Sequence, residues 1–193
     1  GVVMTSLGVI IGGCSVVKLG LIRTMVIGAC MSPVSNLIFA WLATQGHSLS
    51  ALTVAIGVDN VSSGYAGTAL IAYMSSLTSI GFTATQYALF TSLYALPGKL
   101  IATQSGRIVE ASARAAEGTG PFAGLRALFA NLQPGVLTTG AATSGVTPAA
   151  LGAGYVAFFL YSAIIGVFGI VLAFIVAGKQ TALQARQKAA MEE

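Results

Sequence analysis

Long apolar runs are the feature of this 193-residue chain that most limits its fold. Several stretches of about 20 residues carry almost no charge, and this is the length that an α-helix needs to cross the hydrocarbon core of a bilayer. Hydrophobic residues make up 55% of the chain and charged residues only 7%. A water-soluble protein needs far more charge on its surface, so the sequence predicts an all-α integral membrane protein.

The apolar runs predict a bundle of about five membrane-crossing helices. The first two cover 1–17 and 21–43, and the next two form a hairpin over 51–104 with its turn at 77–82. Thr147 and Pro148 suit the N-cap and first position of the last helix. The expected division is 1–106 for four helices, 107–148 for an extracytoplasmic loop, 149–178 for the last helix and 179–193 for a helical tail.

Residues 107–148 are too polar and too rich in Gly, Pro, Ser and Thr to cross a membrane. Their charged and apolar residues separate onto different helical faces, which predicts short amphipathic helices along the membrane interface. A solvated loop is the alternative. The charged face comprises Arg107, Glu110, Arg114 and Glu117, and the apolar face comprises Phe122, Leu125, Leu128, Phe129 and Leu132.

The distribution of basic residues predicts the orientation in the membrane. Cytoplasmic segments carry an excess of Lys and Arg. With the C-terminus inside, five basic residues are cytoplasmic and three are outside. The inner five are Lys18, Arg23, Lys179, Arg186 and Lys188, and the outer three are Arg107, Arg114 and Arg126. Because these residues are spread out rather than clustered, they indicate membrane topology and a lipid environment, and no nucleic-acid partner.

One acid and one base lie at membrane depth in the hairpin. Asp59 is 21 residues before Ile80, near the centre of the turn, and Lys99 is 19 residues after it. The two therefore differ in depth by only ~3 Å and could face each other. Ionisable residues inside membrane helices typically mark a transport path or a partner, which makes both residues candidates for a substrate or proton pathway. The alternative is that Lys99 extends to the interface and Asp59 is hydrated.

Small and polar residues recur with helical spacing around Asp59. Asn60, Ser63, Gly64 and Gly67 are expected to share its face and to look into the bundle, because polar groups must be satisfied away from lipid. Glycine-mediated helix packing is the alternative for Gly64 and Gly67. The Gly8 and Gly12 pair has the same small-residue spacing and is expected to pack closely.

The second helix of the hairpin begins with a capping signal. Thr83 as N-cap and Gln86 three residues later match a capping box. Thr85 has no task in that motif, and a helix N-terminus attracts anions, so Thr85 and Gln86 are also candidates for the pathway. Pro97 is expected to bend the helix just before Lys99.

Catalytic and metal-binding signatures are missing from the sequence. It has no nucleophile elbow and no P-loop spacing. Cys14 and Cys30 lie in apolar runs without partners at metal-ligand spacing, and His47 is a single loop histidine. We therefore predict a protein that is not an enzyme and that needs no metal or cofactor.

Two strings in the hairpin resemble a known family. Asp59-Asn60 followed by Ser62-Ser63-Gly64 and Gly67, and then FTATQYAL at 82–89, is similar to the AmpG-like muropeptide permeases of the major facilitator superfamily. The resemblance covers about the first 105 residues and implies a facilitator bundle whose eighth to twelfth helices this chain supplies. It also implies that Asp59 and Lys99 lie on helices lining the cavity.

The resemblance implies proton-linked import of anhydromuropeptides across the bacterial inner membrane, for cell-wall recycling. It leaves other solutes open, such as acetyl-CoA or a drug. A helical scaffold subunit without transport is a further alternative from a different class. Because the chain is apolar from Gly1 and has no initiator Met, we expect it to be a fragment whose partner is the missing N-terminal half, and we expect no transport by the fragment alone.

Overall fold

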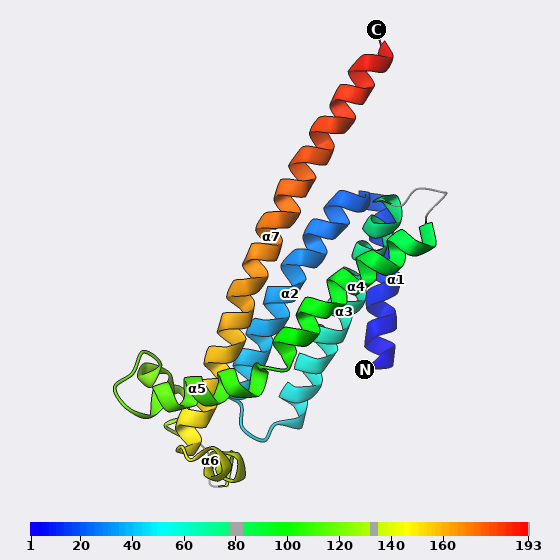
Figure 1. Ribbon diagram of the computed structural model, residues 1–193. Coiled ribbons are helices and arrows are strands. Elements are labelled where there is room, and N and C mark those ends of the chain that lie inside the picture. Colours follow the sequence, from blue (N-terminus) through cyan, green and yellow to red (C-terminus); the bar gives the residue numbers. More distant parts are fainter. Residues whose placement is uncertain (78–82, 132–134, 193) are drawn as a thin grey trace.

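The computed structural model describes residues 1–77, 83–131 and 135–192, with the side chains of Thr83, Pro97 and 183–192 outside that description. All regular structure in this part of the chain is helical (Figure 1). The helices are α1 (Val2–Leu19), α2 (Leu21–Ala43), α3 (Leu49–Leu77), α4 (Thr83–Ala102), α5 (Ser105–Glu117), η1 (Ala123–Phe129), α6 (Thr138–Ser144) and α7 (Pro148–Glu192).

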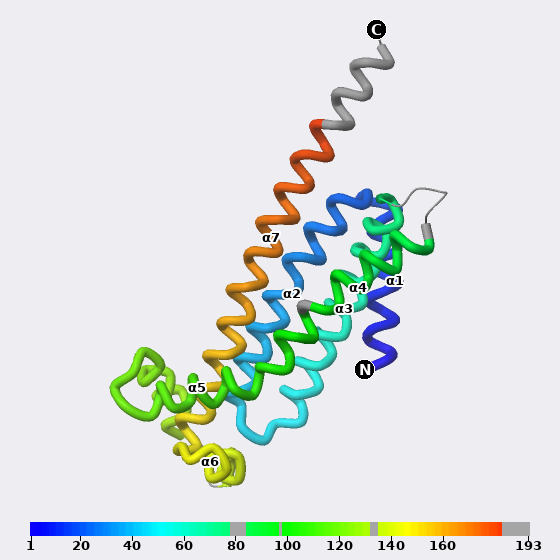
Figure 2. The backbone as a smooth tube through the Cα atoms, viewed as in Figure 1, coloured from blue at the N-terminus to red at the C-terminus, as the bar shows by residue number. Residues whose placement is uncertain are grey.

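The long helices run side by side and the short ones gather at one end (Figure 1). Helix α2 packs against both α3 and α7, and α1 packs against α3. Helix α4 touches α3 only sparsely. The smooth trace in Figure 2 shows α5 and α6 at the end of the bundle opposite to the α1–α2 turn.

Within the residues that the structure describes, three helices are long and apolar enough to cross a membrane: α1, α2 and the Pro148–Ala182 part of α7. Helices α3 and α4 have 29 and 20 residues, so they are also long enough, but their polar side chains make them less apolar. The predicted fold class, an all-α bundle of membrane helices, is confirmed. That α3 and α4 also cross the membrane stays a prediction.

Glycines bring α1 and α3 into close contact. A Cβ added to Gly8 would collide with the carbonyl oxygen of Val61, and one added to Gly64 would collide with that of Thr5. Gly12 is also buried in this contact, where its Cβ would lie 3.1 Å from the carbonyl oxygen of Tyr65. The structure thus confirms that Gly8, Gly12 and Gly64 serve close packing, as small residues do between membrane helices.

Gly67 differs from these glycines. A Cβ at this position would meet nothing within 4 Å. The packing interpretation of Gly67 was therefore wrong, because this position has room for a side chain and no neighbouring backbone needs the glycine.

The α2–α7 contact is arranged around the proline inside α2. Pro33 is buried, and its ring lies against Gly166 of α7, where an added Cβ would come within 3.0 Å of the Pro33 Cγ. Further along, the rings of Phe39 and Phe159 stack with their centroids 5.4 Å apart. Proline removes one backbone hydrogen bond from α2, and a glycine in the facing helix makes room for the ring.

The segment between α4 and α7 folds onto the first turns of α7. Helix α5 turns Val109 and Ala113 toward Gly154, where an added Cβ would lie 2.7 Å from the Val109 carbonyl oxygen. Phe129 of η1 is buried in the same contact and lies close to Gly152. The predicted amphipathic helix exists as α5, but its apolar face is covered by protein. Its location at the membrane interface stays a prediction.

The N-terminus of α7 is capped as predicted. The backbone N–H of Ala150 donates to Thr147 Oγ1 at 3.3 Å, and the N–H of Thr147 donates to the carboxylate of Glu117 at 3.0 Å. Arg126 holds the C-terminus of α5 by donating to the carbonyl oxygens of Glu117 and Gly118 at 2.7 and 3.0 Å. The start of α7 and the end of α5 are therefore joined by hydrogen bonds as well as by packing.

Removing the cap is expected to loosen this junction. Thr147→Ala should lower the free energy of unfolding by about 0.5–2 kcal/mol, whereas Thr147→Ser keeps the hydroxyl and should be tolerated. Thermal unfolding of the purified variants measures the difference. Thr143→Ala is the matched control, because that hydroxyl is exposed and bonds only to the Thr139 carbonyl within α6. Equal melting temperatures for all variants would contradict the capping role.

Candidate solute and proton pathway

Helix α3 points the side chains of Asp59 and Asn60 at two different helices. Ser35 of α2 donates from Oγ to Asp59 Oδ1 at 3.2 Å. The same hydroxyl lies 3.0 Å from the Ser32 carbonyl oxygen, so its single proton is shared between two acceptors. Ser35 is buried and Asp59 is half-buried. The carboxylate therefore lies beside α2 with one protein donor, among the residues that the structure describes.

Asn60 connects α3 to α1. Thr5 of α1 donates from Oγ1 to Asn60 Oδ1 at 2.9 Å, while Asn60 Nδ2 donates to the Ile56 carbonyl oxygen at 2.6 Å. A groove of about 560 Å³ runs beside Asn60 and is lined otherwise by α1. Both oxygen and nitrogen of the amide are thus used, and Asn60 holds two helices together at the wall of a groove.

The predicted polar face of α3 is split in the structure. Asp59 turns to α2, Asn60 and Gly64 turn to α1, and Ser63 is exposed. The expectation that all of them look into one interior was wrong. Asp59 and Asn60 are consecutive and so point about 100° apart around the helix axis, which lets each face a different neighbouring helix.

The remaining residues predicted for the pathway lie on α4. Thr85 is exposed and Gln86 is half-buried. The Thr83 side chain lies outside the described residues, and the predicted capping box falls there. Lys99 is exposed and lines a groove of about 610 Å³ along α4, together with Thr91 and Ser92.

Asp59 and Lys99 do not form the expected ion pair in this conformation. Within the ranges that the structure describes, the one ion pair joins Glu110 and Arg114 in α5 at 3.6 Å. Counting residues fixes the height of a side chain along a helix but not its direction around the axis. Asp59 turns toward α2, and α4 has little contact with α3. That the two charges act as a coupled pair stays a prediction.

Thr5 and Ser35 are the site residues that sequence reasoning missed. Both are hydroxyl residues inside apolar runs, where a polar side chain needs an internal partner. A hydroxyl in an apolar run therefore hints at a contact with another helix. It is a weak hint, because the hydroxyls of serine and threonine also bond to carbonyl oxygens of their own helix.

Cys14 and Cys30 are free thiols. In the described ranges, no three His, Cys, Asp or Glu side chains gather closely enough to hold a metal ion.

These observations define a class: a multi-pass α-helical membrane protein with a carboxylate and an amide held between helices. Comparison with known proteins narrows it. The chain is 33% identical over 106 residues to a protein of Rickettsia prowazekii named "Putative transporter AmpG 3". It is 29% identical over 109 residues to "Putative transporter AmpG 4" of Rickettsia conorii, and 36% identical over 107 residues to an uncharacterized protein of Haemophilus influenzae.

These matches cover 55%, 56% and 52% of this chain, and about a quarter of the length of each relative. They confirm the predicted resemblance to AmpG-like proteins over about half of the chain. No family model and no solved structure matches the chain.

Proposed function

We propose that this chain is part of a secondary active transporter, a permease rather than an enzyme, which imports anhydromuropeptides together with protons across the bacterial inner membrane. The observation that carries the proposal is the similarity to AmpG-named transporters, supported by a carboxylate inside a helix bundle. In this proposal the C-terminus lies in the cytoplasm. The rest of the longer protein completes the solute site.

Asp59 is the group best suited to carry the proton. It is the only acidic residue in the first 106 residues, and among the described residues its half-buried carboxylate has one donor, Ser35. A carboxylate with one donor can take up a proton without breaking a salt bridge, and the acid form can rearrange its bond with the Ser35 hydroxyl. Alternating exposure of such a group to the two sides of a membrane couples proton flow to solute movement.

Asn60 is proposed to act beside it as a contact for the solute or as a hinge between α1 and α3. Its amide joins the two helices, and the adjoining groove places it at a surface that small molecules can reach. Lys99, Thr85 and Gln86 on α4 are proposed to contribute from a helix that packs only sparsely and so can move relative to α3. Transporters of this kind open and close largely by rocking one group of helices against another around the site.

Uptake by the whole protein tests the function. Proteoliposomes containing the full-length transporter are expected to accumulate radiolabelled anhydromuropeptide when the outside is acidic, and a protonophore should abolish the accumulation. Acetyl-CoA offered in parallel tests the alternative solute. Accumulation that ignores the proton gradient would contradict coupling. Absence of uptake for every solute by folded protein would favour a structural subunit.

A further inference from the structure

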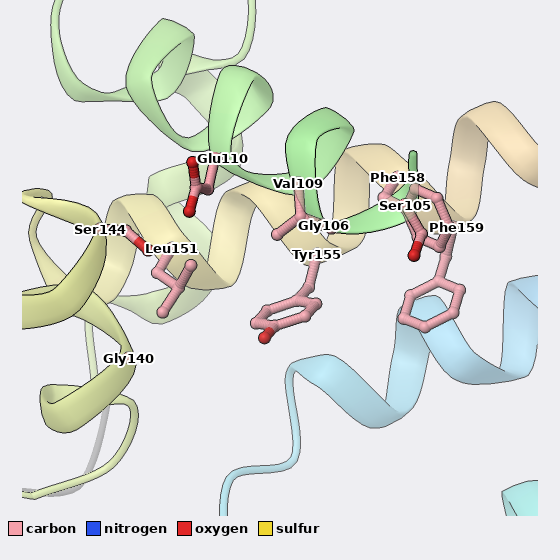
Figure 3. Close-up of a pocket in the computed structure, with 10 residues that line it drawn as sticks. All are labelled: Ser105, Gly106, Val109, Glu110, Gly140, Ser144, Leu151, Tyr155, Phe158 and Phe159. Carbon is pink, nitrogen blue, oxygen red and sulfur yellow. The ribbon is translucent and has the colours of Figure 1, made fainter. Parts of the chain in front are cut away.

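A further cavity lies where α5, α6 and α7 meet. It has a volume of about 380 Å³, within the range of small-molecule pockets. All three helices contribute to its wall: Gly106 and Glu110 from α5, Ser144 from α6, and Tyr155 from α7. The carboxylate of Glu110 and the ring of Tyr155 both project into the space between the helices (Figure 3).

Two of the polar groups that line this cavity, Glu110 and Ser105, can only accept hydrogen bonds toward it. Among the described lining residues, Glu110 is the only charged one. The Ser105 hydroxyl donates its proton to the Ala102 carbonyl oxygen at 2.8 Å, so toward the cavity it can only accept. For the hydroxyls of Ser144 and Tyr155 the described part of the chain supplies no hydrogen-bond partner. These two hydroxyls can donate or accept, so it is the Glu110 carboxylate that disfavours an anion and favours a positively charged ligand.

The opposite wall is aromatic. Tyr155, Phe158 and Phe159 of α7 line the cavity, and the rings of Phe158 and Phe159 meet edge to face with centroids 5.3 Å apart. Phe159 is also held by stacking on Phe39 of α2, so this wall is anchored to the bundle. Aromatic faces attract cations, and they do so more strongly where water is excluded.

We infer that this cavity binds a small organic cation, such as a quaternary or primary ammonium compound, between the Glu110 carboxylate and the aromatic wall. A neutral ligand would use the rings and hydroxyls but not the charge. Arg114 already pairs with Glu110 and would compete with a bound cation. The N–O distance of this ion pair is long at 3.6 Å, and the side chains of Arg114 and Glu110 are 67% and 47% exposed. Exposed pairs of this kind are weak, so a cation in the cavity can displace the arginine.

Ligand-observed NMR on the whole protein in lipid nanodiscs tests the inference, with choline as the probe and its neutral carbon analogue dimethylbutanol as the comparison. Choline is expected to bind and the neutral analogue to bind at least about tenfold more weakly, the equivalent of ~1.4 kcal/mol. Binding should also weaken as salt concentration rises, because the pairing charge is close to the surface. The readout does not involve transport, so it succeeds or fails independently of the proposed function.

Two variants test whether choline binds in the cavity, and each has a control variant outside it. Glu110→Gln removes the charge and should weaken choline binding about tenfold. Glu117→Gln is its control, because this nearby acid does not line the cavity and glutamine can still accept from Thr147. Gly106→Leu should block the cavity, since an added Cβ there meets nothing within 4 Å and leucine favours the helix. Gly124→Leu, equally free of neighbours but outside the cavity, is its control.

Loss of choline binding in Glu110→Gln and Gly106→Leu, with both controls unchanged, would support the site. Equal binding of choline and its neutral analogue would overturn the assignment of a cation. Choline binding that Gly106→Leu leaves unchanged would overturn the cavity itself. Because Gly106→Leu fills open space, a folding failure is not expected, and Glu110→Gln gives an independent result in any case.

Discussion

Gly64→Ala is expected to separate α1 from α3 and to reduce the yield of folded protein sharply. The new methyl group would overlap the carbonyl oxygen of Thr5, which belongs to the backbone of α1 and cannot turn away. Overpacking a tight contact typically lowers stability by about 1–3 kcal/mol. The separation would also stretch the bond from Thr5 to Asn60, which lies one turn away at 2.9 Å. Loss of packing and loss of the hydrogen bond both lower the stability of the folded protein.

Gly67→Ala is the matched control for this prediction. It makes the same substitution three residues later in the same helix, where an added Cβ meets nothing within 4 Å. Alanine favours a helix over glycine by about 1 kcal/mol, so this variant should be unchanged or slightly more stable. Size-exclusion chromatography and thermal unfolding of the two detergent-purified proteins compare them. Similar behaviour of Gly64→Ala and Gly67→Ala would show that the α1–α3 contact is not as close as described.

The sequence was sufficient to predict the helices but not which of their faces meet. Long apolar runs locate α1, α2 and α7, because the length and composition of a membrane helix are set by the bilayer. The spacing of Gly8 and Gly12 also predicts a close contact correctly. The partner of that contact could not be predicted, because it is the backbone of Val61 in another helix. For the same reason Gly64 and Gly67 look alike in the sequence and differ in the structure.

Electrostatic pairing was the weakest sequence inference. Asp59 and Lys99 have similar depth by counting, yet depth leaves the rotation of each helix undetermined. The structure directs Asp59 to Ser35. The cavity between α5, α6 and α7 was also beyond sequence reasoning, because it depends on how a polar connection folds back onto the first turns of α7. Glu110 was noted only as part of a charged helical face.

Asp59→Asn is expected to leave the protein folded and to abolish proton-coupled uptake. The amide oxygen of asparagine can still accept from Ser35 at the same position, so the contact between α2 and α3 is kept. Asparagine cannot bind and release a proton in the physiological range, and the coupling step is lost. Unchanged chromatography and melting temperature, together with uptake at background level, are the expected results.

Lys99→Met separates the role of the lysine from that of the aspartate. Lys99 is exposed and has no ion pair with Asp59, so its removal should not destabilise the protein as breaking a buried pair would. Reduced uptake by a stable Lys99→Met protein would support a role for Lys99 in the pathway. A large loss of stability in Lys99→Met that Asp59→Asn restores in the double variant would instead indicate that the two charges pair in the intact transporter.

The most direct test of the account is the proton influx that accompanies solute uptake, measured with a pH-sensitive dye inside proteoliposomes of the full-length transporter. Wild-type protein is expected to carry protons inward only when anhydromuropeptide is added, and folded Asp59→Asn protein is expected to carry neither protons nor solute against a gradient. Equal proton influx and accumulation in wild-type and Asp59→Asn proteoliposomes would contradict the assignment of Asp59 as the proton-carrying group.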